Sequence, residues 1–309
     1  MAQSFVFYQG KILNESNVHI DIRSRAFNYG LGCFEGIRGF WNPRKEQMYL
    51  FRVRDHYERL LRSGKTLNID IPYTVDELIH WTIELVRANE FKTTIYIRPV
   101  AFSASNDIRP ELNEEDDRIL MYCLPLGEII GQDELRTSVA SWTRVGDNMI
   151  PPRAKATAAY LNSALASLEA HQSGYDEAIF LTNEGKVAEG PAENIFIVRE
   201  QVLITPPLSD DILEGITRAT VMTLAKQELR LRVIERSIPR TELYAAEEVF
   251  FTGTALGIKP VIEIDNRRIG AGHLGPVCRS LQKLYAEIVK GNSTKYRQFN
   301  TPVYYPFWN

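Results

Sequence analysis

One lysine lies in a run of small residues that suits covalent chemistry. In the segment Arg-Ala-Lys155-Ala-Thr-Ala-Ala-Tyr160, the alanines leave room around the backbone for a bulky planar cofactor. A lysine held away from water loses its charge readily, and its amine can then form an imine with a carbonyl group. Most lysines are plain surface charges, so this motif needs a second group to support it.

A carboxylate further along the chain supplies that second group. Glu189 occurs in Val-Ala-Glu189-Gly-Pro-Ala-Glu-Asn-Ile-Phe, and taken alone it would be a solvated loop acid like most others. Its segment and that of Lys155 flank the same predicted set of short strands, which favours a shared site. An imine-forming lysine, a tyrosine such as Tyr160 and one well-placed carboxylate are the groups that pyridoxal phosphate chemistry needs from a protein.

Two turns and one arginine could bind a phosphate group. Leu213-Glu-Gly-Ile-Thr-Arg218 begins a predicted helix, whose first backbone N–H groups, glycine and threonine hydroxyl together suit an anion. On these residues alone, a simple helix N-cap is the better interpretation. Thr252-Gly-Thr-Ala-Leu-Gly257 follows a predicted strand and forms a second such turn. Arg59 is either a plain charge on a helix surface or a guanidinium that binds phosphate through paired hydrogen bonds.

A glycine-rich segment near the N-terminus invites a nucleotide-binding interpretation. Its spacing in Gly30-Leu-Gly-Cys-Phe-Glu-Gly36 is G-x-G-x-x-x-G, and no hydrophobic strand precedes it. Cofactor phosphate binding is therefore not expected there. The preceding polar and aromatic turn suits the lining of a small-molecule site, with Tyr29 and Phe34 as its aromatic side chains, although a purely structural glycine loop explains these residues equally well.

Composition excludes several classes of protein. The chain has 309 residues, 44% of them apolar, and a formal charge of −3, so it can form two domains with cores and has no basic surface for nucleic acid or membranes. Neither a secretory leader nor an apolar run of transmembrane length is found, which predicts a cytoplasmic protein. The three cysteines and five histidines are scattered, which predicts reduced, mostly buried thiols and no metal site.

The first third of the chain combines strands and helices. Its clearest strand is predicted at 92–102, where polar and apolar residues alternate and period two puts Tyr96 and Arg98 on one face. A capping-box pair of threonine and glutamate opens a helix over 74–89. The other elements predicted here are a shorter helix over 56–65 and a strand over 118–124.

The rest of the chain contains helices and short strands. Four apolar residues are spaced at i, i+3, i+4 and i+7, on one face of a helix that begins just after the lysine. They are Leu161, Ala164, Leu165 and Leu168. Short strands with turn residues between them favour an antiparallel meander over βαβ winding. Strands are predicted at 177–182, 194–198, 201–204 and 247–251, and helices from 215 and over 274–290.

A change in composition divides the chain. The stretch Gly-Glu-Ile-Ile-Gly-Gln-Asp has the turn residues and polar flank of a linker. The predicted organisation is a small N-terminal α+β domain at 1–126, a linker at 127–134, a large cofactor-binding domain at 135–290 and an aromatic-rich tail at 291–309. The tail has no periodicity, so either it packs on the body or a subunit neighbour, or it is disordered.

Taken in order, these motifs resemble those of the class IV pyridoxal-phosphate-dependent aminotransferases, and most closely those of the branched-chain amino acid aminotransferases. The resemblance covers about residues 5–290. Any one motif is weak, but seven in the family's order are strong support. They are Tyr29-Gly-x-x-x-Phe-Glu-Gly-Ile-Arg38, His56-x-x-Arg59-Leu, Tyr96-Ile-Arg98-Pro, Lys155 with Tyr160, Glu189-Gly-x-x-Glu-Asn-Ile-Phe, Gly215-Ile-Thr217-Arg and Gly253-Thr254-Ala.

The resemblance implies a fold, a cofactor and an assembly. The implied fold is α+β, of type IV and like that of D-amino acid aminotransferase, with a small α/β N-terminal domain and a larger pseudo-barrel C-terminal domain. The implied activity is ping-pong transfer of an amino group, through pyridoxal 5′-phosphate, between an amino acid and a 2-oxo acid such as 2-oxoglutarate. A homodimer or higher homo-oligomer is also implied, in which the glycine-aromatic loop and the loop at 103–110 reach a neighbour's site.

The resemblance also implies roles for individual residues. Lys155 is similar to the Schiff-base lysine, and Glu189 to the carboxylate beneath the pyridine nitrogen. Tyr160 matches the tyrosine that hydrogen-bonds the cofactor's phenolic oxygen. The phosphate-binding residues are implied to be Arg59, Ile216, Thr217 and Thr254. The substrate-binding residues are implied to be Tyr29, Phe34, Gly36, Tyr96 and Arg98, with the backbone N–H groups of Ala255 and Leu256 for the substrate's α-carboxylate.

The chain departs from the family pattern around the substrate. The loop Ser103-Ala-Ser-Asn-Asp-Ile-Arg109-Pro is polar where a Gly-rich apolar loop is common, and Leu126 and Ile129 stand where an aromatic pair is usual. Ala158-Ala159 replaces a Gly-Asn pair. These changes predict acceptance of bulkier or carboxylate-bearing donors, with Arg109 available to bind an anion.

Other functions fit parts of the sequence. The cofactor residues alone do not distinguish an L-amino acid transaminase from a D-amino acid or (R)-amine transaminase, or from a lyase like aminodeoxychorismate lyase on the same fold. Tyr96-Ile-Arg98 favours the L-branched-chain type. More remote alternatives are a nucleotide-binding oxidoreductase built on the glycine loop and a catalytically silent scaffold protein.

Overall fold

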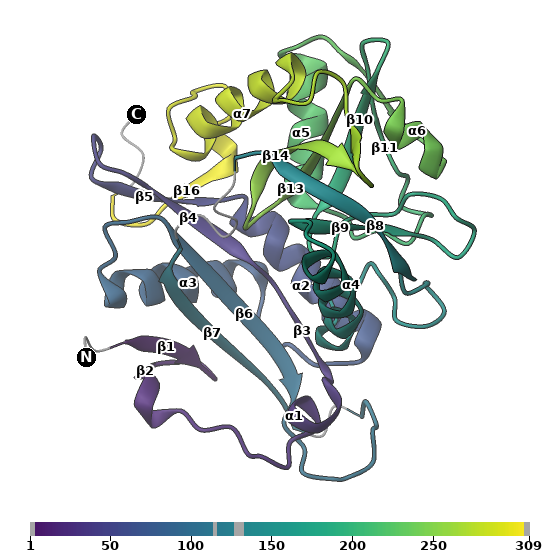
Figure 1. Ribbon diagram of the computed structural model, residues 1–309. Helices are drawn as coiled ribbons and strands as arrows, with labels where there is room; N and C mark the ends of the chain where they lie inside the picture. Colours follow the sequence, from purple (N-terminus) through teal and green to yellow (C-terminus); the bar gives the residue numbers. More distant parts are fainter. Residues whose placement is uncertain (1–3, 114–115, 127–132, 306–309) are drawn as a thin grey trace. The chain divides into compact units, whose positions relative to one another are not determined.

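A computed structural model describes residues 4–113, 116–126 and 133–305 of the chain. The chain forms two compact units (Figure 1). The first unit comprises Met1–Gly127, Ala154–Ala158 and Glu287–Asn309, and the second comprises Glu128–Arg153 and Ala159–Ala286. Most of the predicted linker at 127–134, with Ile129, lies outside the described residues, and the linear division into domains stays a prediction.

The first unit is built on an antiparallel sheet. Its strands are β1 (Phe5–Tyr8), β2 (Lys11–Asn14), β3 (Gly32–Phe34), β4 (Ile37–Asn42), β5 (Gln47–Phe51), β6 (Ile95–Ser103), β7 (Asp117–Pro125) and β16 (Asn300–Pro302). They lie in the order β16-β5-β4-β6-β7-β1-β2, and β3 also pairs with β6. The strands predicted at 92–102 and 118–124 are confirmed as β6 and β7, which pair along the whole length of β6.

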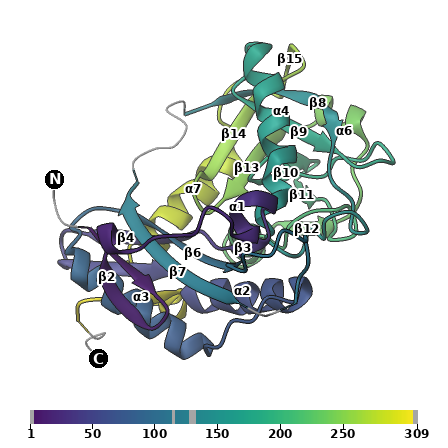
Figure 2. The same cartoon turned by 90° about the horizontal axis from the view of Figure 1, so that it is seen from below.

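Two helices cover one face of this sheet (Figure 2). α3 (Val75–Asn89) begins at the predicted capping box, in which the side chains of Thr74 and Glu77 each bond the other residue's backbone N–H. α2 (Val53–Leu67) confirms the helix predicted at 56–65 and extends it at both ends. The apolar faces of both helices pack with the strands in one buried core. Shorter elements are α1 (Arg25–Tyr29), η1 (Glu15–Asn17) and η3 (Arg297–Phe299).

The aromatic-rich tail packs on the edge of this sheet. β16 pairs antiparallel with β5, and the Gln47 side chain accepts backbone N–H groups of Val303 and Tyr304. The side chains of Tyr296 and Val303 are buried. Of the two alternatives predicted for the tail, packing on the body is therefore right for 291–305, and 306–309 lie outside the described residues.

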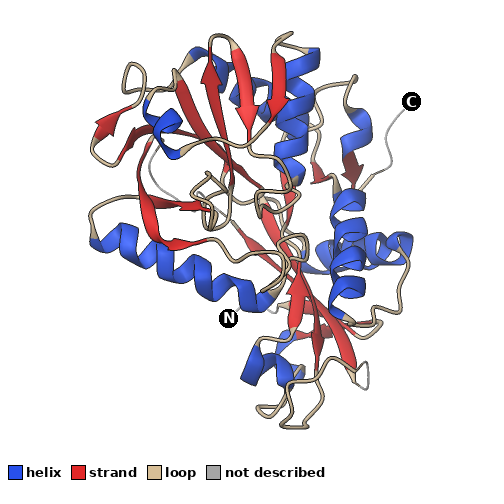
Figure 3. Cartoon of the chain, turned by 90° about the vertical axis from the view of Figure 1, so that its right-hand side faces the viewer, coloured by secondary structure: helices blue, strands red, loops and turns tan. Residues whose placement is uncertain are grey.

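The second unit combines a mixed sheet with helices (Figure 3). Its strands are β8 (Leu135–Thr143), β9 (Glu177–Leu181), β10 (Asn194–Arg199), β11 (Val202–Thr205), β12 (Arg232–Glu235), β13 (Glu248–Gly253), β14 (Gly257–Ile264) and β15 (Arg267–Arg268). Its helices are α4 (Tyr160–Gln172), α5 (Ile216–Gln227), α6 (Arg240–Tyr244) and α7 (Pro276–Val289), whose last residues belong to the first unit. The short helix η2 (Thr157–Ala159) precedes α4 and begins in the first unit. None of the described helices is both long and apolar enough to span a lipid bilayer.

The predicted antiparallel meander is only partly right. The sheet order is β12-β11-β10-β13-β14-β8-β9, and β10 pairs antiparallel with β11 as predicted. However, β9 pairs parallel with β8 instead of with β10, and β11 pairs parallel with β12. A parallel pair needs a crossover of roughly a dozen residues or more, and α4 and α5 supply these crossovers. The unit therefore contains the βαβ connections that the sequence pattern disfavoured.

Helix α4 buries a different face from the predicted one. Its buried side chains are Ser163, Ala166 and Ala170, and it packs on β8 and β9, where small residues allow close approach. Leu161 and Leu168 of the predicted apolar face are 68% and 52% exposed. The periodicity thus predicts the helix correctly, but its apolar stripe does not face the core of this unit.

Candidate active site

Lys155 lies in a short segment that packs against β3 in the first unit. Its backbone N–H donates to Ser63 Oγ at 3.2 Å, and its carbonyl accepts from the Phe34 N–H at 3.1 Å. The Ser63 hydroxyl in turn donates to the Arg59 carbonyl at 2.9 Å, so the lysine segment is tied to α2 as well as to β3. A backbone held at both its donor and its acceptor fixes the direction in which the Lys155 side chain leaves the chain.

Five of the predicted residues come together around the Phe34 ring. Lys155 Nζ lies 5.1 Å from the ring centroid, and Arg98 Cζ lies 4.2 Å from it. The Tyr96 hydroxyl accepts hydrogen bonds from Arg98 Nε at 3.1 Å and from Nη2 at 2.7 Å, which orients the guanidinium. A Cβ at Gly36 would collide with the Tyr96 ring, so a larger residue there would displace the Tyr96 side chain. An amine and a guanidinium are thereby held near one aromatic ring.

Arg59 is buried against the carboxylate of Glu35, which belongs to the glycine-rich motif but has no role predicted from the sequence. Its Nε and Nη2 donate to the two carboxylate oxygens of Glu35 at 2.6 and 2.8 Å, and His56 Nδ1 lies 2.7 Å from Glu35 Oε2. Burial favours the neutral carboxyl of Glu35, but Arg59 and His56 outweigh it and hold its pKa well below the ordinary value. Burial also lowers the pKa of His56, against the opposing effect of Glu35.

Tyr29 and Arg109 lie at a loop whose backbone carbonyl groups are bound by the Arg25 side chain. The fully buried Arg25 side chain donates from Nε to the Asp107 carbonyl at 3.4 Å and from Nη1 to a second loop carbonyl at 3.0 Å. The Tyr29 hydroxyl donates to the Ile108 carbonyl at 2.5 Å. The Arg109 side chain is 64% exposed and lies 2.6 Å from the Asp107 carboxylate, whose pKa it lowers to about 2. The Arg109 charge is thus balanced within its own loop.

Glu189 is a buried carboxylate at the centre of a polar network in the second unit. Its Oε1 lies 2.9 Å from Arg144 Nη2. Its Oε2 accepts from Asn194 Nδ2 at 2.9 Å and from the Leu213 N–H at 3.1 Å. The sequence does not predict Arg144, because it reaches Glu189 from the distant segment just after β8. It does not predict a role for Asn194 either, because the motif that contains Asn194 does not reveal its partner.

Both predicted phosphate turns are formed in the second unit. Ile216 and Thr217 open α5 directly after Gly215, where a Cβ would collide with Asn194 Oδ1. The first N–H groups of an α-helix have no partner within the helix, which suits an anion. The turn between β13 and β14 contains Thr254, Ala255 and Leu256, and Tyr160 is the first residue of α4.

The predicted site residues therefore fall into two groups, one in each unit. The first-unit group is Tyr29, Phe34, Gly36, Arg59, Tyr96, Arg98, Arg109 and Lys155, and the second-unit group is Tyr160, Glu189, Ile216, Thr217, Thr254, Ala255 and Leu256. Lys155 and Glu189 belong to different units, because the Lys155 segment bridges to β3 through Ala156 and Cys33 in the first unit, whereas Glu189 lies in the second. The first group supplies an amine and cations, and the second supplies a buried carboxylate and a helix start.

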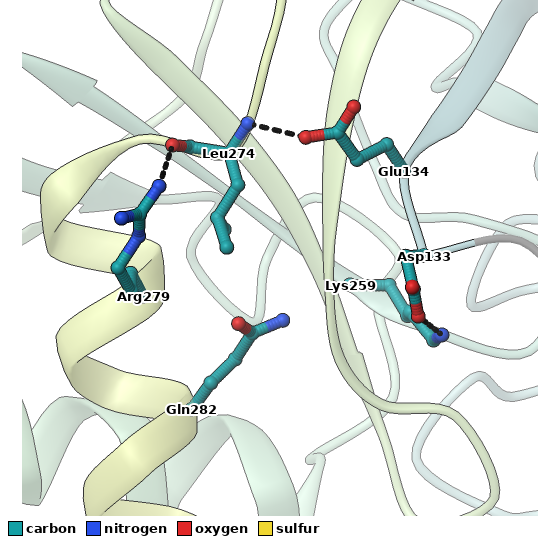
Figure 4. A pocket seen from close by; sticks show the side chains of 6 residues that line it. All are labelled: Asp133, Glu134, Lys259, Leu274, Arg279 and Gln282. Atoms are coloured by element: carbon teal, nitrogen blue, oxygen red, sulfur yellow. Dashed lines mark hydrogen bonds and ion pairs between the residues drawn. The ribbon is translucent and has the colours of Figure 1, made fainter.

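A separate polar pocket lies in the second unit (Figure 4). Within it, Glu134 accepts the Leu274 N–H at 2.7 Å, and Lys259 lies 3.7 Å from Asp133. The lining residues are Asp133, Glu134, Lys259, Leu274, Arg279 and Gln282. The residues predicted for the site do not line this pocket, so it is not the candidate active site.

Comparison with known proteins gives one consistent family. Residues 32–264 match the family model described as amino-transferase class IV. A probable branched-chain-amino-acid aminotransferase of Aquifex aeolicus is 45% identical over 304 residues, which cover 98% of each chain. The crystal structure of the branched-chain aminotransferase of Thermoproteus uzoniensis with norvaline is 47% identical, covers 98% of this chain and 100% of its own, and has a TM-score of 0.94. The branched-chain amino acid aminotransferase of Thermobaculum terrenum in its PLP-form is 39% identical over 97% of this chain and 98% of its own, with a TM-score of 0.93.

Proposed function

Because the chain belongs to the class IV aminotransferases, we propose that it moves an amino group from a branched-chain L-amino acid to a 2-oxo acid such as 2-oxoglutarate. Membership of the family also confirms the type of fold and the cofactor, pyridoxal 5′-phosphate, that the motifs predicted. The observation that carries the proposal is that the Lys155 amine and the Arg98 guanidinium both lie beside the Phe34 ring. The D-amino acid, (R)-amine, lyase, oxidoreductase and scaffold alternatives have no comparable support.

The residues present suit pyridoxal phosphate. Ile216 and Thr217 stand at a helix start, which suits an anion, and the buried Thr252 hydroxyl, just before the second turn, has no hydrogen-bond partner among the described residues. By resemblance to the family, we assign the phosphate to Arg59, Ile216, Thr217 and Thr254, the phenolic oxygen to Tyr160 and the pyridine nitrogen to Glu189. When bound, the cofactor supplies a carbonyl carbon for the amino group and a ring that accepts electrons.

The side chains around Phe34 perform the steps that belong to the protein. Lys155 Nζ takes a proton from the substrate Cα and later returns one, as a positioned base and acid. Arg98, oriented by Tyr96, binds a substrate carboxylate, with Ala255 and Leu256 offering backbone N–H groups to the α-carboxylate. Phe34 and Tyr29 present aromatic surface to an aliphatic side chain.

A panel of amino donors tests the proposed substrate class. With 2-oxoglutarate as acceptor, we expect leucine, isoleucine and valine to give the highest kcat/KM, and their D-enantiomers values at least about 100-fold lower. Amine transfer is followed by coupling glutamate formation to a dye. A fastest reaction with a D-amino acid or an (R)-amine would reject the proposal.

Arg109 tests the predicted acceptance of anionic donors. Its pairing with Asp107 favours a role within its own loop, and an exposed ion pair contributes at most about 1 kcal/mol. We therefore expect Arg109→Ala to change kcat/KM for leucine and for glutamate by less than about fivefold. Arg23→Ala is the matched control, because Arg23 is also exposed and lies 3.6 Å from an aspartate two residues earlier, Asp21. A loss above tenfold that is confined to glutamate would instead support anion binding by Arg109.

We further propose a homodimer, because large apolar side chains are exposed on each unit. In the first unit, Ile22, Phe27 and Ile108 are 77%, 75% and 82% exposed. In the second unit, Leu161 and Leu168 form an exposed stripe on α4. Monomeric soluble proteins rarely leave such apolar surface open, so a second copy of the chain is the proposed cover.

The double variant Leu161→Glu/Leu168→Glu is expected to be a monomer. Burial of each leucine contributes about 1.5–3 kcal/mol, and a buried unpaired charge adds a further penalty, so association weakens by at least about 100-fold. Light scattering after size exclusion at micromolar concentration measures the mass. Lys226→Glu, at an exposed position on α5, is the control and should keep the parent mass. A dimer that survives the double change would contradict the proposed interface.

We also propose a cytoplasmic location, from the state of the thiols. Cys33, Cys123 and Cys278 are buried, as predicted, and none is in a disulfide. Burial raises the pKa of Cys33 and of Cys123 to about 12, so both thiols stay protonated near neutral pH. Buried thiols without disulfide partners are typical of reducing compartments.

A further inference from the structure

Asn194 lies where three segments of the second unit meet. Its side chain is buried, with 4% exposure, and it opens β10 shortly after Glu189. Its Nδ2 donates to Glu189 Oε2 at 2.9 Å and to the Leu213 carbonyl at 3.0 Å. The Leu213 N–H donates to the same carboxylate oxygen at 3.1 Å, so the three residues form a closed ring of hydrogen bonds.

The orientation of the Asn194 amide follows from this ring. The two groups that face one end of the amide, a carboxylate oxygen and a carbonyl oxygen, are both acceptors, so that end must be the NH2 group. The other end, Oδ1, then points at Gly215, where a Cβ would collide with it. The φ of Gly215 is −70°, which any residue adopts, so the glycine is required by Asn194 and not by its own backbone.

The register of the sheet links Asn194 to the second turn as well. In the β10–β13 pair, Asn194 lies opposite Thr252. Thr252 precedes the turn that contains Thr254, and its buried hydroxyl has no hydrogen-bond partner among the residues described. One asparagine thus adjoins the Glu189 carboxylate, the turn before α5 and the strand that leads into the second turn.

We propose that Asn194 is a positioning residue that holds the Glu189 carboxylate and the turn before α5 in register, so that the ring and the phosphate of the cofactor are recognised together. The inference rests on the proposed cofactor roles of Glu189, Ile216 and Thr217. The hydrogen-bond ring joins Glu189 to Leu213, which are 24 residues apart in the chain. A substitution that displaces the turn before α5 should therefore also displace the Glu189 carboxylate, and the reverse.

The test measures cofactor affinity instead of turnover. The apoprotein is titrated with pyridoxal phosphate by quenching of tryptophan fluorescence, and pyridoxal and inorganic phosphate compete as partial ligands. Asn194→Asp puts a carboxylate where Glu189 needs a donor, and we expect the Kd of pyridoxal phosphate to rise about 10- to 100-fold, with both partial ligands weakened. Asn42→Asp is the matched control, because Asn42 is also 4% exposed and its Nδ2 also donates to two acceptors, but in the first unit. We expect this control to change the Kd by less than about threefold.

A second variant leaves Asn194 in place and covers the case in which Asn194→Asp folds poorly. In Gly215→Ala the added methyl group displaces Asn194 Oδ1, so pyridoxal, which has no phosphate, should also bind more weakly. Weakening of inorganic phosphate alone in Gly215→Ala, or unchanged affinity for pyridoxal in both variants, would overturn the inference. Failure of the unmodified protein to bind pyridoxal phosphate would instead overturn the proposed function, so the two failures are distinguishable.

Discussion

Lys155→Ala is expected to lower kcat/KM for the transamination of leucine by at least about 10⁴-fold, because the variant lacks the amine to which we assign the proton transfer. Its segment is held by Ser63 and Phe34 through backbone atoms, so alanine should leave the local fold intact. After incubation with pyridoxal phosphate and sodium borohydride, the parent protein should gain the mass of a permanently attached cofactor. The variant should not, as mass spectrometry would show.

An exposed lysine gives the control for this experiment. Lys283→Ala, on α7, should retain the permanent label and keep its activity within about twofold of the parent. Circular dichroism of both variants checks that the fold is unchanged. A full label on the Lys155→Ala protein would assign the reactive amine to another lysine.

Glu35→Gln is expected to have the largest effect on stability. The change leaves the Arg59 guanidinium, which is 4% exposed, without the carboxylate that binds two of its nitrogens. Removing one partner of a buried ion pair costs about 3–5 kcal/mol of unfolding free energy. Urea unfolding at neutral pH measures the loss. Glu58→Gln, at an exposed position next to Arg59 on α2, is the control and should change the unfolding free energy by no more than about 0.5 kcal/mol.

The pH dependence of this effect has a definite sign. Burial opposes the ionisation of Glu35, but Arg59 and His56 outweigh it and place its folded pKa below the ordinary value of 4.5. A carboxyl with a lowered pKa stabilises the fold above its unfolded pKa and loses that contribution as the pH falls toward the folded value. The gap in unfolding free energy between the parent and Glu35→Gln should therefore be largest near neutral pH and shrink below about pH 4.5. A gap that widens on acidification would contradict the charged pair.

Patterns within one segment of the sequence predict those helices and strands whose signals lie entirely inside that segment. The capping box of α3 and the alternation of β6 are complete within their own segments, and the structure follows both. Such patterns do not predict which strands pair with each other. β9 pairs with β8 because α4 crosses between them, and nothing in the short strands themselves reveals that connection. The apolar stripe of α4 likewise indicates a helix without indicating which surface covers it.

The same distinction applies to the site. Lys155 and Glu189 can be proposed from the sequence because each motif contains a chemical group that pyridoxal phosphate chemistry uses. The partners of Glu189 and Arg59 cannot be proposed in this way, since Arg144 approaches Glu189 from the residue after β8 and Glu35 approaches Arg59 from the segment between β3 and β4. Buried polar groups find their partners through tertiary packing, and one sequence does not record which distant segments converge.

The inclusion of Ala154–Ala158 in the first unit has a consequence for recombination between relatives. A chimaera that exchanges only 1–126 would set a foreign Ser63 and Phe34 against the resident Lys155 segment, which both residues hold by hydrogen bonds. Chimaeras that also exchange 154–158 and the chain from Glu287 onward would keep those bonds within one parent. Lys155 and the Phe34 ring beside it must therefore come from the same parent, although they are far apart along the sequence.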